Sequence, residues 1–240
     1  PNKPVMYFSS LLVGLLIPFI IIYVKNLLDT KIHNREDLES VLNSIAIIGE
    51  VPRLSGKEKI LITRNDRSIL SESFRIIRTN LEYIRRSSTV EKYSNVVCVT
   101  STINGEGKSF FSTNMALTFA NTDKRVLLIG ADIRNPKIDL GPLNQKKKRV
   151  SKIGLTEYLS DDSVLIGEAI ETYEVGNTKI DVLLSGRVPL NPAELLMSDR
   201  MEPLFDKVSD QYDYVIVDTA PSMLVSDTLL FSHYAGHTVY

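Results

Sequence analysis

The chain has 240 residues, of which 43% are hydrophobic, and its 28 basic and 29 acidic side chains give a formal net charge of −1. This length is enough for one or two domains with a hydrophobic core, and the balanced charge argues against nucleic acid as the main partner. The single cysteine, Cys98, excludes an internal disulfide, and its place in an apolar run predicts a small buried side chain.

The chain begins with an apolar segment, Val5–Val24, that contains no charged residue and is flanked by Lys3 and Lys25. Because a bilayer core takes about 20 apolar residues in a helix, residues 1–26 are predicted to form a transmembrane helix. A signal peptide, which has a shorter apolar region and a cleavage site, and a core helix of a soluble protein are the alternatives. Basic residues are more frequent after the segment than before it, which predicts a cytosolic C-terminal side.

Residues 27–65 are expected to form a juxtamembrane segment and a linker. Asn34–Leu42 is polar and predicts a helix, whereas Ser44–Leu54 predicts a short β-rich run that ends near Pro52. The polar composition of Ser55–Asp66 is typical of a linker.

A helix is predicted over Asp66–Arg86, at the start of a domain expected to cover residues 66–240. Its apolar residues recur at steps of four and three, as on one face of an amphipathic helix: Leu70, Phe74, Ile77, Leu81 and Ile84. Glu72, Arg75 and Arg78 lie beside this face at one-turn steps, and a solvated charged flank would give the same pattern.

After this helix, apolar runs alternate with helical patterns. Strands are predicted at Val96–Thr100, Val126–Ile129, Ile180–Leu184, Tyr214–Val217 and, as the start of one more, His237–Tyr240; helices are predicted at Ser109–Asn121 and Pro192–Val208. This alternation predicts an α/β fold, a mostly parallel sheet with helices on both faces. Because the sequence stops in a strand, we expect the natural chain to continue past Tyr240.

Two other patterns indicate no catalytic site. The basic cluster Lys146–Arg149 lies among Gly, Pro and Asn residues and predicts a solvated loop, with a contact to anionic lipids as the alternative. The three histidines His33, His233 and His237 do not have the spacing of metal ligands.

The segment Thr102–Ser109 reads TINGEGKS and lies between a predicted strand and a predicted helix. A phosphate-binding loop reads G-x-x-x-x-G-K-[ST], so only Thr102 departs from the pattern. Glycines allow the tight turn, the helix N-terminus attracts phosphate, Lys108 would reach the β- and γ-phosphates, and Ser109 would bind Mg²⁺. The expected nucleotide contacts are Asn104, Gly105, Glu106, Gly107, Lys108, Ser109 and Phe110.

Carboxylates follow two of the predicted strands. Asp218 ends the run YVIVD and would hold Mg²⁺, while Asp132 and Arg134 directly follow VLLIG. Ligand sites in open α/β sheets lie at the carboxyl ends of the strands, so these side chains are expected near the phosphate loop.

Together these motifs resemble those of bacterial tyrosine kinases of the polysaccharide co-polymerase type. Their phosphate loop reads like TSTINGEGKS, their second motif like LLIGADIR and their Walker B motif like VIVDTAP. The segments NREDLES, GEVPRL and RVPLNPAELL and the membrane helix also match, so the resemblance covers nearly the whole chain.

The resemblance implies a P-loop kinase domain on the cytosolic side of the bacterial inner membrane that uses ATP and Mg²⁺ and regulates capsule or exopolysaccharide synthesis and export. Lys108, Asp132 and Asp218 would be catalytic, with Ser109, Asp132 and Asp218 as metal ligands. Asp132 would act as base for the tyrosine hydroxyl.

The same resemblance implies that the kinase domains assemble into a ring through the helix that carries Glu72, Arg75 and Arg78. The partners would be a tyrosine-rich C-terminal tail of a neighbouring subunit, the polysaccharide polymerisation and export proteins, and the membrane. Nucleic acid is not expected as a partner.

Two departures from the family pattern bear on activity. Gly130 stands where the second motif has its first aspartate, and a glycine can neither ligate a metal nor accept a proton. The tyrosine cluster of the tail is absent, because the 10 tyrosines are scattered, so the acceptor is expected beyond Tyr240.

Two other functions fit parts of the sequence. A partition or cell-division ATPase switch would carry a second lysine at the position of Ile103. A weakened nucleotide-binding module that organises the polysaccharide machinery would fit Gly130. Restoring an aspartate at that position would separate a weakened kinase from an intact one.

Overall fold

The computed structural model describes residues 3–29, 31–32, 35–42, 45–54, 61–90, 92–138, 153–223 and 227–240. By their contacts the residues form two compact units, Pro1–Ile47 and Ile48–Tyr240, which are treated separately below. The basic cluster Lys146–Arg149 and His33 lie outside the described residues.

The first unit contains the helices α1 (Lys3–Leu27) and α2 (Arg35–Val41). α1 is long and apolar enough to cross a bilayer, since its 25 residues extend about 37 Å at helical rise. None of its side chains is buried, so the described residues of this unit do not offer α1 an apolar core. α1 is therefore a candidate membrane span, and α2 confirms the polar helix predicted at Asn34–Leu42.

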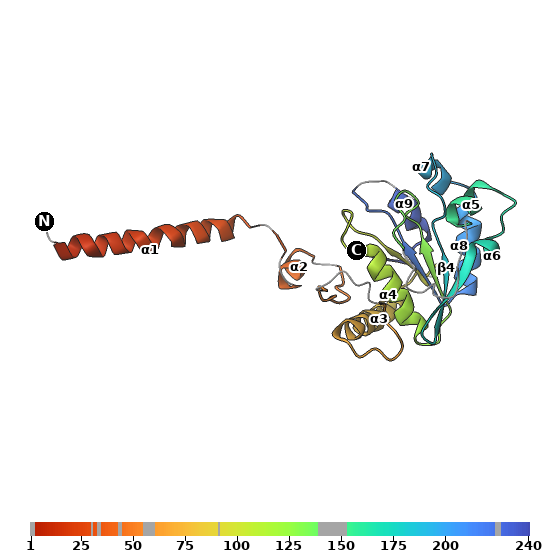
Figure 1. The fold of residues 1–240 in the computed structure, drawn as a ribbon, viewed down its shortest axis with the longest axis horizontal. Helices are drawn as coiled ribbons and strands as arrows, with labels where there is room; N and C mark the ends of the chain where they lie inside the picture. The colour runs from red at the N-terminus through yellow and green to blue at the C-terminus, as the bar shows by residue number, and fades with distance from the viewer. Residues whose placement is uncertain are drawn as a thin grey trace. The chain divides into compact units, whose positions relative to one another are not determined.

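The second unit is an α/β domain built on one six-stranded sheet (Figure 1). Its strands are β1 (Val96–Val99), β2 (Val126–Gly130), β3 (Ile170–Val175), β4 (Thr178–Leu183), β5 (Tyr214–Asp218) and β6 (His237–Val239), in the order β3-β4-β2-β5-β1-β6. All neighbouring pairs are parallel except β3 and β4, which form an antiparallel hairpin. The mostly parallel sheet is confirmed.

Helices α3 (Ile69–Ser87) and α4 (Lys108–Ala120) cover one face of the sheet, and Figure 1 shows them side by side. The predicted stripe on α3 is buried here except for the half-buried Ile84, and Phe74 is fully enclosed against the rings of Phe110 and Phe111. α3 begins at a capped end, where the Ser68 hydroxyl accepts the N–H of Ser71. The amphipathic helix predicted at the start of the domain is therefore confirmed.

The opposite face packs against α5 (Leu155–Ser160), α6 (Ile166–Ala169), α8 (Met201–Gln211) and α9 (Asp227–Phe231), which is followed by the 3₁₀ turn η2 (Ser232–Tyr234). Successive strand residues alternate between the two cores: Leu128 faces α3 and α4, whereas Leu127 and Ile129 face α5 and α8. Cys98 belongs to the second core and is buried, as predicted. Both faces of the sheet are thus covered.

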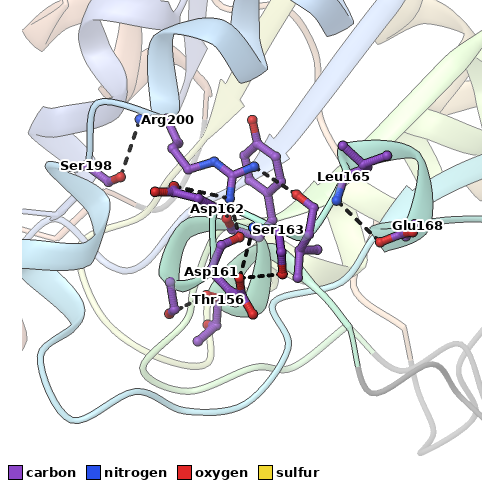
Figure 2. A network of polar contacts seen from close by, with 11 residues as sticks. Thr156, Asp161, Asp162, Ser163, Leu165, Glu168, Ser198 and Arg200 are labelled. Atoms are coloured by element: carbon purple, nitrogen blue, oxygen red, sulfur yellow. Dashed lines mark hydrogen bonds and ion pairs between the residues drawn. The ribbon is translucent and has the colours of Figure 1, made fainter.

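The single helix predicted at Pro192–Val208 is wrong, because it is divided into α7 (Pro192–Leu196) and α8. Ser198 and Asp199 form a turn between them, and the Ser198 hydroxyl accepts the N–H of Arg200 at 3.3 Å. Figure 2 shows the Arg200 guanidinium between the ends of α5 and α6, where it donates to the carbonyls of Tyr158, Asp161 and Val164. Arg200 thus ties the start of α8 to the segment between α5 and α6 on the same face of the sheet.

The β-rich run predicted at Ser44–Leu54 is also wrong, because residues 45–54 form no strand. Ile48 and Leu54 pack against the core under α3 instead, and the Ile48 carbonyl accepts Asn80 Nδ2 at 2.8 Å. The end of the expected linker is packed as well, since Ile62 is buried and donates its N–H to Asn114 Oδ1 at 2.9 Å. The compact unit therefore begins at Ile48.

Candidate active site

The loop between β1 and α4 has the backbone of a phosphate cradle. Gly105 and Gly107 have φ angles of +91° and +96°, in the left-handed region where a side chain causes strain. Gly107 is the N-cap of α4 and supplies no side-chain cap, so the first N–H groups of the helix are free to meet an anion. The loop predicted from sequence is present at the carboxyl end of β1.

Lys108 lies across this loop. Its Nζ donates to Ser101 Oγ at 3.0 Å, which holds the ammonium group on the strand side of the cradle. The loop is braced a second time by Glu106, whose Oε2 accepts the N–H of Ile103 at 3.1 Å. Both contacts leave the N–H groups of the two glycines unused by side chains.

The remaining expected nucleotide contacts differ in what their side chains do. Asn104 is exposed and its Oδ1 accepts Lys137 Nζ at 3.4 Å, on the rim of the loop. Phe110 packs its ring edge-on against Phe74, with centroids 6.2 Å apart, so only its main chain is available to a nucleotide. The expected nucleotide contact at Phe110 stays a prediction.

Asp218, the last residue of β5, is 2% exposed and sits behind the first turn of α4. Ser112 Oγ donates to its Oδ1 at 3.1 Å. Burial raises the pKa of Asp218 to about 6, against the opposing effects of hydrogen bonds from Ser109 and Ser112 and of the charge on Lys108, while Asp132 adds to the rise. A buried carboxylate with this balance favours a neighbouring cation.

Asp132 is brought next to Asp218 by the backbone. β2 and β5 pair so that Gly130 lies opposite Asp218, and the N–H groups of Ala131 and Asp132 both donate to the Asp218 carbonyl, at 2.8 and 3.1 Å. The carboxylate of Asp132 is buried and accepts the N–H of Asn135 at 3.0 Å. The two carboxylates predicted from separate motifs thus meet at one edge of the sheet.

These groups fit a magnesium ion. The hydroxyl of Ser109 lies close enough to the Asp218 carboxylate to lower its pKa, and hard oxygen donors of this kind are the ligands that Mg²⁺ takes beside the phosphates of a nucleotide. Within the described part of the chain no three His, Cys, Asp or Glu side chains cluster as a metal site. Because Mg²⁺ in nucleotide sites keeps several waters and phosphate oxygens, Ser109 and the carboxylates would supply only part of its shell.

Comparison with known proteins identifies the family to which this chain belongs. Residues 94–234 match the family model described as an AAA domain. The tyrosine-protein kinase YwqD of Bacillus subtilis (strain 168) is 35% identical over 184 residues, which is 76% of this chain and 72% of that protein. The chain belongs to the bacterial tyrosine-kinase family. The tyrosine-protein kinase ptk of Acinetobacter johnsonii is 29% identical over 98% of the chain, and the chain spans 32% of its length.

The fold agrees with this family. The solved kinase domain of the Escherichia coli tyrosine kinase ETK superposes with a TM-score of 0.72 at 29% identity, over 85% of this chain and 79% of that one. The α/β P-loop architecture of the second unit is therefore that of a bacterial tyrosine-kinase domain.

The expected oligomer contacts of the kinase family, Glu72, Arg75 and Arg78, lie on α3. Arg75 pairs with Glu72 at 3.0 Å and donates to the Asp66 carbonyl at 2.6 Å. Arg78 Nη1 reaches the carbonyl of Thr118 near the end of α4, at 3.4 Å. Within one chain these three side chains therefore brace α3, and their role between chains stays a prediction.

Three residues of the kinase site were not foreseen from sequence: Ser101, Ser112 and Asp227. Ser112 lies one turn after Lys108, so helical spacing could have placed it behind the loop. Ser101 precedes the loop and Asp227 opens α9, and neither has a local signal that identifies its partner. Asp227 is the buried partner of Arg134.

Proposed function

We propose that this chain is the catalytic part of an ATP-dependent protein-tyrosine autokinase of the bacterial inner membrane that regulates capsule or exopolysaccharide biosynthesis and export. The observation that carries the proposal is the buried pair Asp132 and Asp218 beside the Gly105–Gly107 cradle and Lys108. Membership in the tyrosine-kinase family supplies the acceptor class, a tyrosine.

The residues divide the work of phosphoryl transfer among them. The N–H groups that open α4 bind the phosphates of ATP, and Lys108 exchanges Ser101 for the β- and γ-phosphate oxygens. A magnesium ion at Ser109, Asp132 and Asp218 would supply the positive charge that stabilises the transferring group. Asp132 accepts the proton of the tyrosine hydroxyl as the phosphoryl group arrives.

The proposed partners follow from the same assignment. A tyrosine-rich C-terminal tail of a neighbouring subunit is the acceptor, and a ring held by Glu72, Arg75 and Arg78 brings it to the site. α1 is the membrane anchor, with the kinase domain in the cytoplasm, and the polysaccharide polymerisation and export proteins are the assembly that phosphorylation regulates. The apolar, unburied surface of α1 supports the anchor.

The decisive experiment replaces Lys108 in the full-length protein. We expect Lys108→Met to abolish phosphotransfer to a tyrosine-rich tail peptide because the phosphate charge loses its cation. Lys124→Met, an exposed lysine at the opposite edge of the sheet, is the matched control and should retain full transfer. Unchanged transfer in Lys108→Met would overturn the proposal.

A second function is favoured by one observation, the glycine at position 130. A site with one carboxylate fewer could serve a nucleotide-binding assembly module whose phosphotransfer is weak. ATP hydrolysis by the full-length protein without phosphotyrosine would instead favour an ATPase switch, against which Ile103 already counts. Phosphotyrosine on the full-length protein at a rate comparable with other family members would exclude both.

A further inference from the structure

The turn that follows β2 is tied to the start of α9 by a bidentate ion pair. Arg134 Nε donates to Asp227 Oδ2 at 2.6 Å, and Nη2 donates to Oδ1 at 3.0 Å. The Asp227 side chain is 2% exposed, whereas that of Arg134 is 37% exposed. Parallel guanidinium–carboxylate bonds of this kind fix orientation as well as distance.

On one side the pair holds the turn that carries Asp132. Arg134 is two residues after Asp132, and Asn135 donates its N–H to the Asp132 carboxylate. The turn therefore has two fixed points, the Asp218 carbonyl at its beginning and Asp227 near its end. Release of the second point would leave the turn held at its beginning, by the Asp218 carbonyl and the buried Ile133, but not at the residues after Asp132.

On the other side the pair holds the segment that leaves β5. Thr228, next to Asp227, donates its hydroxyl to the carbonyl of Ala220 at 2.6 Å, two residues beyond Asp218. α9 is itself anchored by Phe231, which is buried against Phe205 with ring centroids 6.3 Å apart. The segments that follow Asp132 and Asp218 thus converge on the first turn of α9.

We propose that Asp227 is a positioning residue that acts through Arg134 to hold the Asp132 carboxylate in place beside Asp218. This inference rests on the proposed kinase function. Two of the five N–H donors of Arg134 are committed to Asp227, which fixes the direction of the guanidinium and of the turn that carries it. Asp227 touches neither substrate nor metal, and its effect is on the Mg²⁺–nucleotide complex that the two carboxylates receive.

The test compares two aspartates that each form a bidentate pair with an arginine. Asp227→Asn weakens the pair at the site, and Asp123→Asn weakens the exposed pair with Arg64, whose distances are 2.9 and 2.7 Å, at the far end of α4. The control is backbone-compatible because Asp123 has a φ of +60°, which asparagine tolerates. Binding of fluorescent ADP is measured as a function of Mg²⁺, beside phosphotransfer, in the full chain.

We expect Asp227→Asn to raise the Mg²⁺ concentration for half-maximal ADP binding about tenfold and to lower kcat by a similar factor, as changes behind metal ligands do. ADP affinity in EDTA should change less than about twofold, because the glycine cradle is untouched. Amide hydrogen exchange of Asp132 and Asn135 in the ligand-free protein should accelerate. Asp123→Asn should alter none of these quantities.

An unchanged Mg²⁺ requirement in folded Asp227→Asn, or an equal shift in Asp123→Asn, would overturn the inference. If Asp227→Asn fails to fold, Asp227→Glu, which keeps the charge, provides the same test and should give a smaller shift in the Mg²⁺ requirement; no shift overturns the inference. A natural protein without phosphotransfer in which Asp227→Asn still shifts the Mg²⁺ requirement would support the positioning role and overturn the proposed function.

Discussion

The sheet has charged side chains both at the amino ends and at the carboxyl ends of its strands, but the two ends differ in how far these charges are exposed to water. At the amino ends of the strands, ion pairs such as Arg125–Asp213 are open to water, with side chains 66% and 36% exposed. At the carboxyl ends, the carboxylates of Asp132, Asp218 and Asp227 are all buried. The charged side chains at the amino ends are therefore solvated, whereas the carboxylates at the carboxyl ends are buried.

The difference indicates which carboxylate is left for a ligand. Asp227 is neutralised by an arginine, and Asp132 accepts a backbone N–H, whereas Asp218 accepts a hydroxyl group and has Lys108 only as a nearby charge. Because burial raises the pKa of Asp218 in spite of these groups, Asp218 is the least compensated of the three. A metal ion at Asp218 would remove this imbalance, whereas a charge at the solvated edge has little to gain.

The variant expected to have the largest effect on activity is Asp218→Asn, which removes a buried charge at the carboxyl ends of the strands. Phosphotransfer should fall about 100-fold or more, because the site loses a charge that acts only with metal and nucleotide bound. In EDTA the same variant should be more stable than the natural protein above pH 6. Urea unfolding and a tail-peptide assay measure the two effects.

The sign of the stability effect follows from the raised pKa. The folded state holds the Asp218 proton up to about pH 6, whereas the unfolded state releases it near 3.8, so the free energy of unfolding falls as pH rises through this window. The ionised carboxylate then costs about 3 kcal/mol above pH 6, a penalty that asparagine avoids. Equal stability of the two proteins at both pH 4 and pH 7.5 would contradict the account.

We expect a smaller effect on nucleotide binding from Gly107→Ala, which changes the backbone of the phosphate cradle and leaves the carboxylates intact. No atom lies within 4 Å of a Cβ built at Gly107, so the strain arises from its φ of +96° alone. We expect ADP binding to weaken about tenfold, since relief of strain of roughly 1–2 kcal/mol moves the N–H groups. Gly167→Ala, which also meets no atom but has an ordinary φ, is the control and should bind ADP normally.

Gly130→Asp increases the difference between the two ends of the strands, because it adds a carboxylate to the buried carboxyl ends. A Cβ at this position would lie 2.9 Å from Ser185 Oγ and 3.2 Å from Ile138 Cδ1. We expect a loss of about 1–3 kcal/mol in the free energy of unfolding from overpacking. Ser185→Ala should recover part of this loss in the double variant, and strictly additive effects in chemical denaturation would show that Ser185 does not limit the site.

The smallest effect is expected at the solvated edge. Asp213 Oδ2 accepts the N–H of Arg125 at 2.8 Å, so Asp213→Ala should cost about 1 kcal/mol of unfolding free energy, the value of one exposed hydrogen bond. Asp213→Asn retains an acceptor and should cost less. Neither variant should change phosphotransfer, and a change in it would break the division between the two edges.

Local patterns in the sequence were sufficient for much of the fold. The buried strands are continuous apolar runs and the α3 stripe has helical periodicity, and the phosphate loop, Asp132 and Asp218 lie at the ends of strands, where their motifs place them. The hairpin strand β3 was not predicted, because its alternating pattern IETYEV is short and lies at the edge of the sheet. The break before α8 depends on Arg200 meeting carbonyls about 40 residues away, which is a tertiary effect.

The site residues that belong to a local sequence motif were predictable. The contacts that join residues far apart in the sequence were not. Lys108 and Ser109 follow directly from the loop motif, but the bond from Lys108 to Ser101 depends on how the loop folds over the end of β1. The pair Arg134–Asp227 joins residues 93 positions apart, and no local pattern relates them. Long-range ion pairs of this kind require coordinates.

Asn114 connects the segment at Ile62 to the first turn of α4 through two hydrogen bonds. Its side chain accepts the N–H of Ile62 and donates to the Phe110 carbonyl at 3.1 Å, in the first turn of the helix that opens at the phosphate cradle. The chain that enters the compact unit is thus held first by Ile48 and Leu54 under α3, and then at Ile62 by a side chain of α4. A displacement at Ile62 would pass through this one side chain to the helical turn that opens at the phosphate cradle.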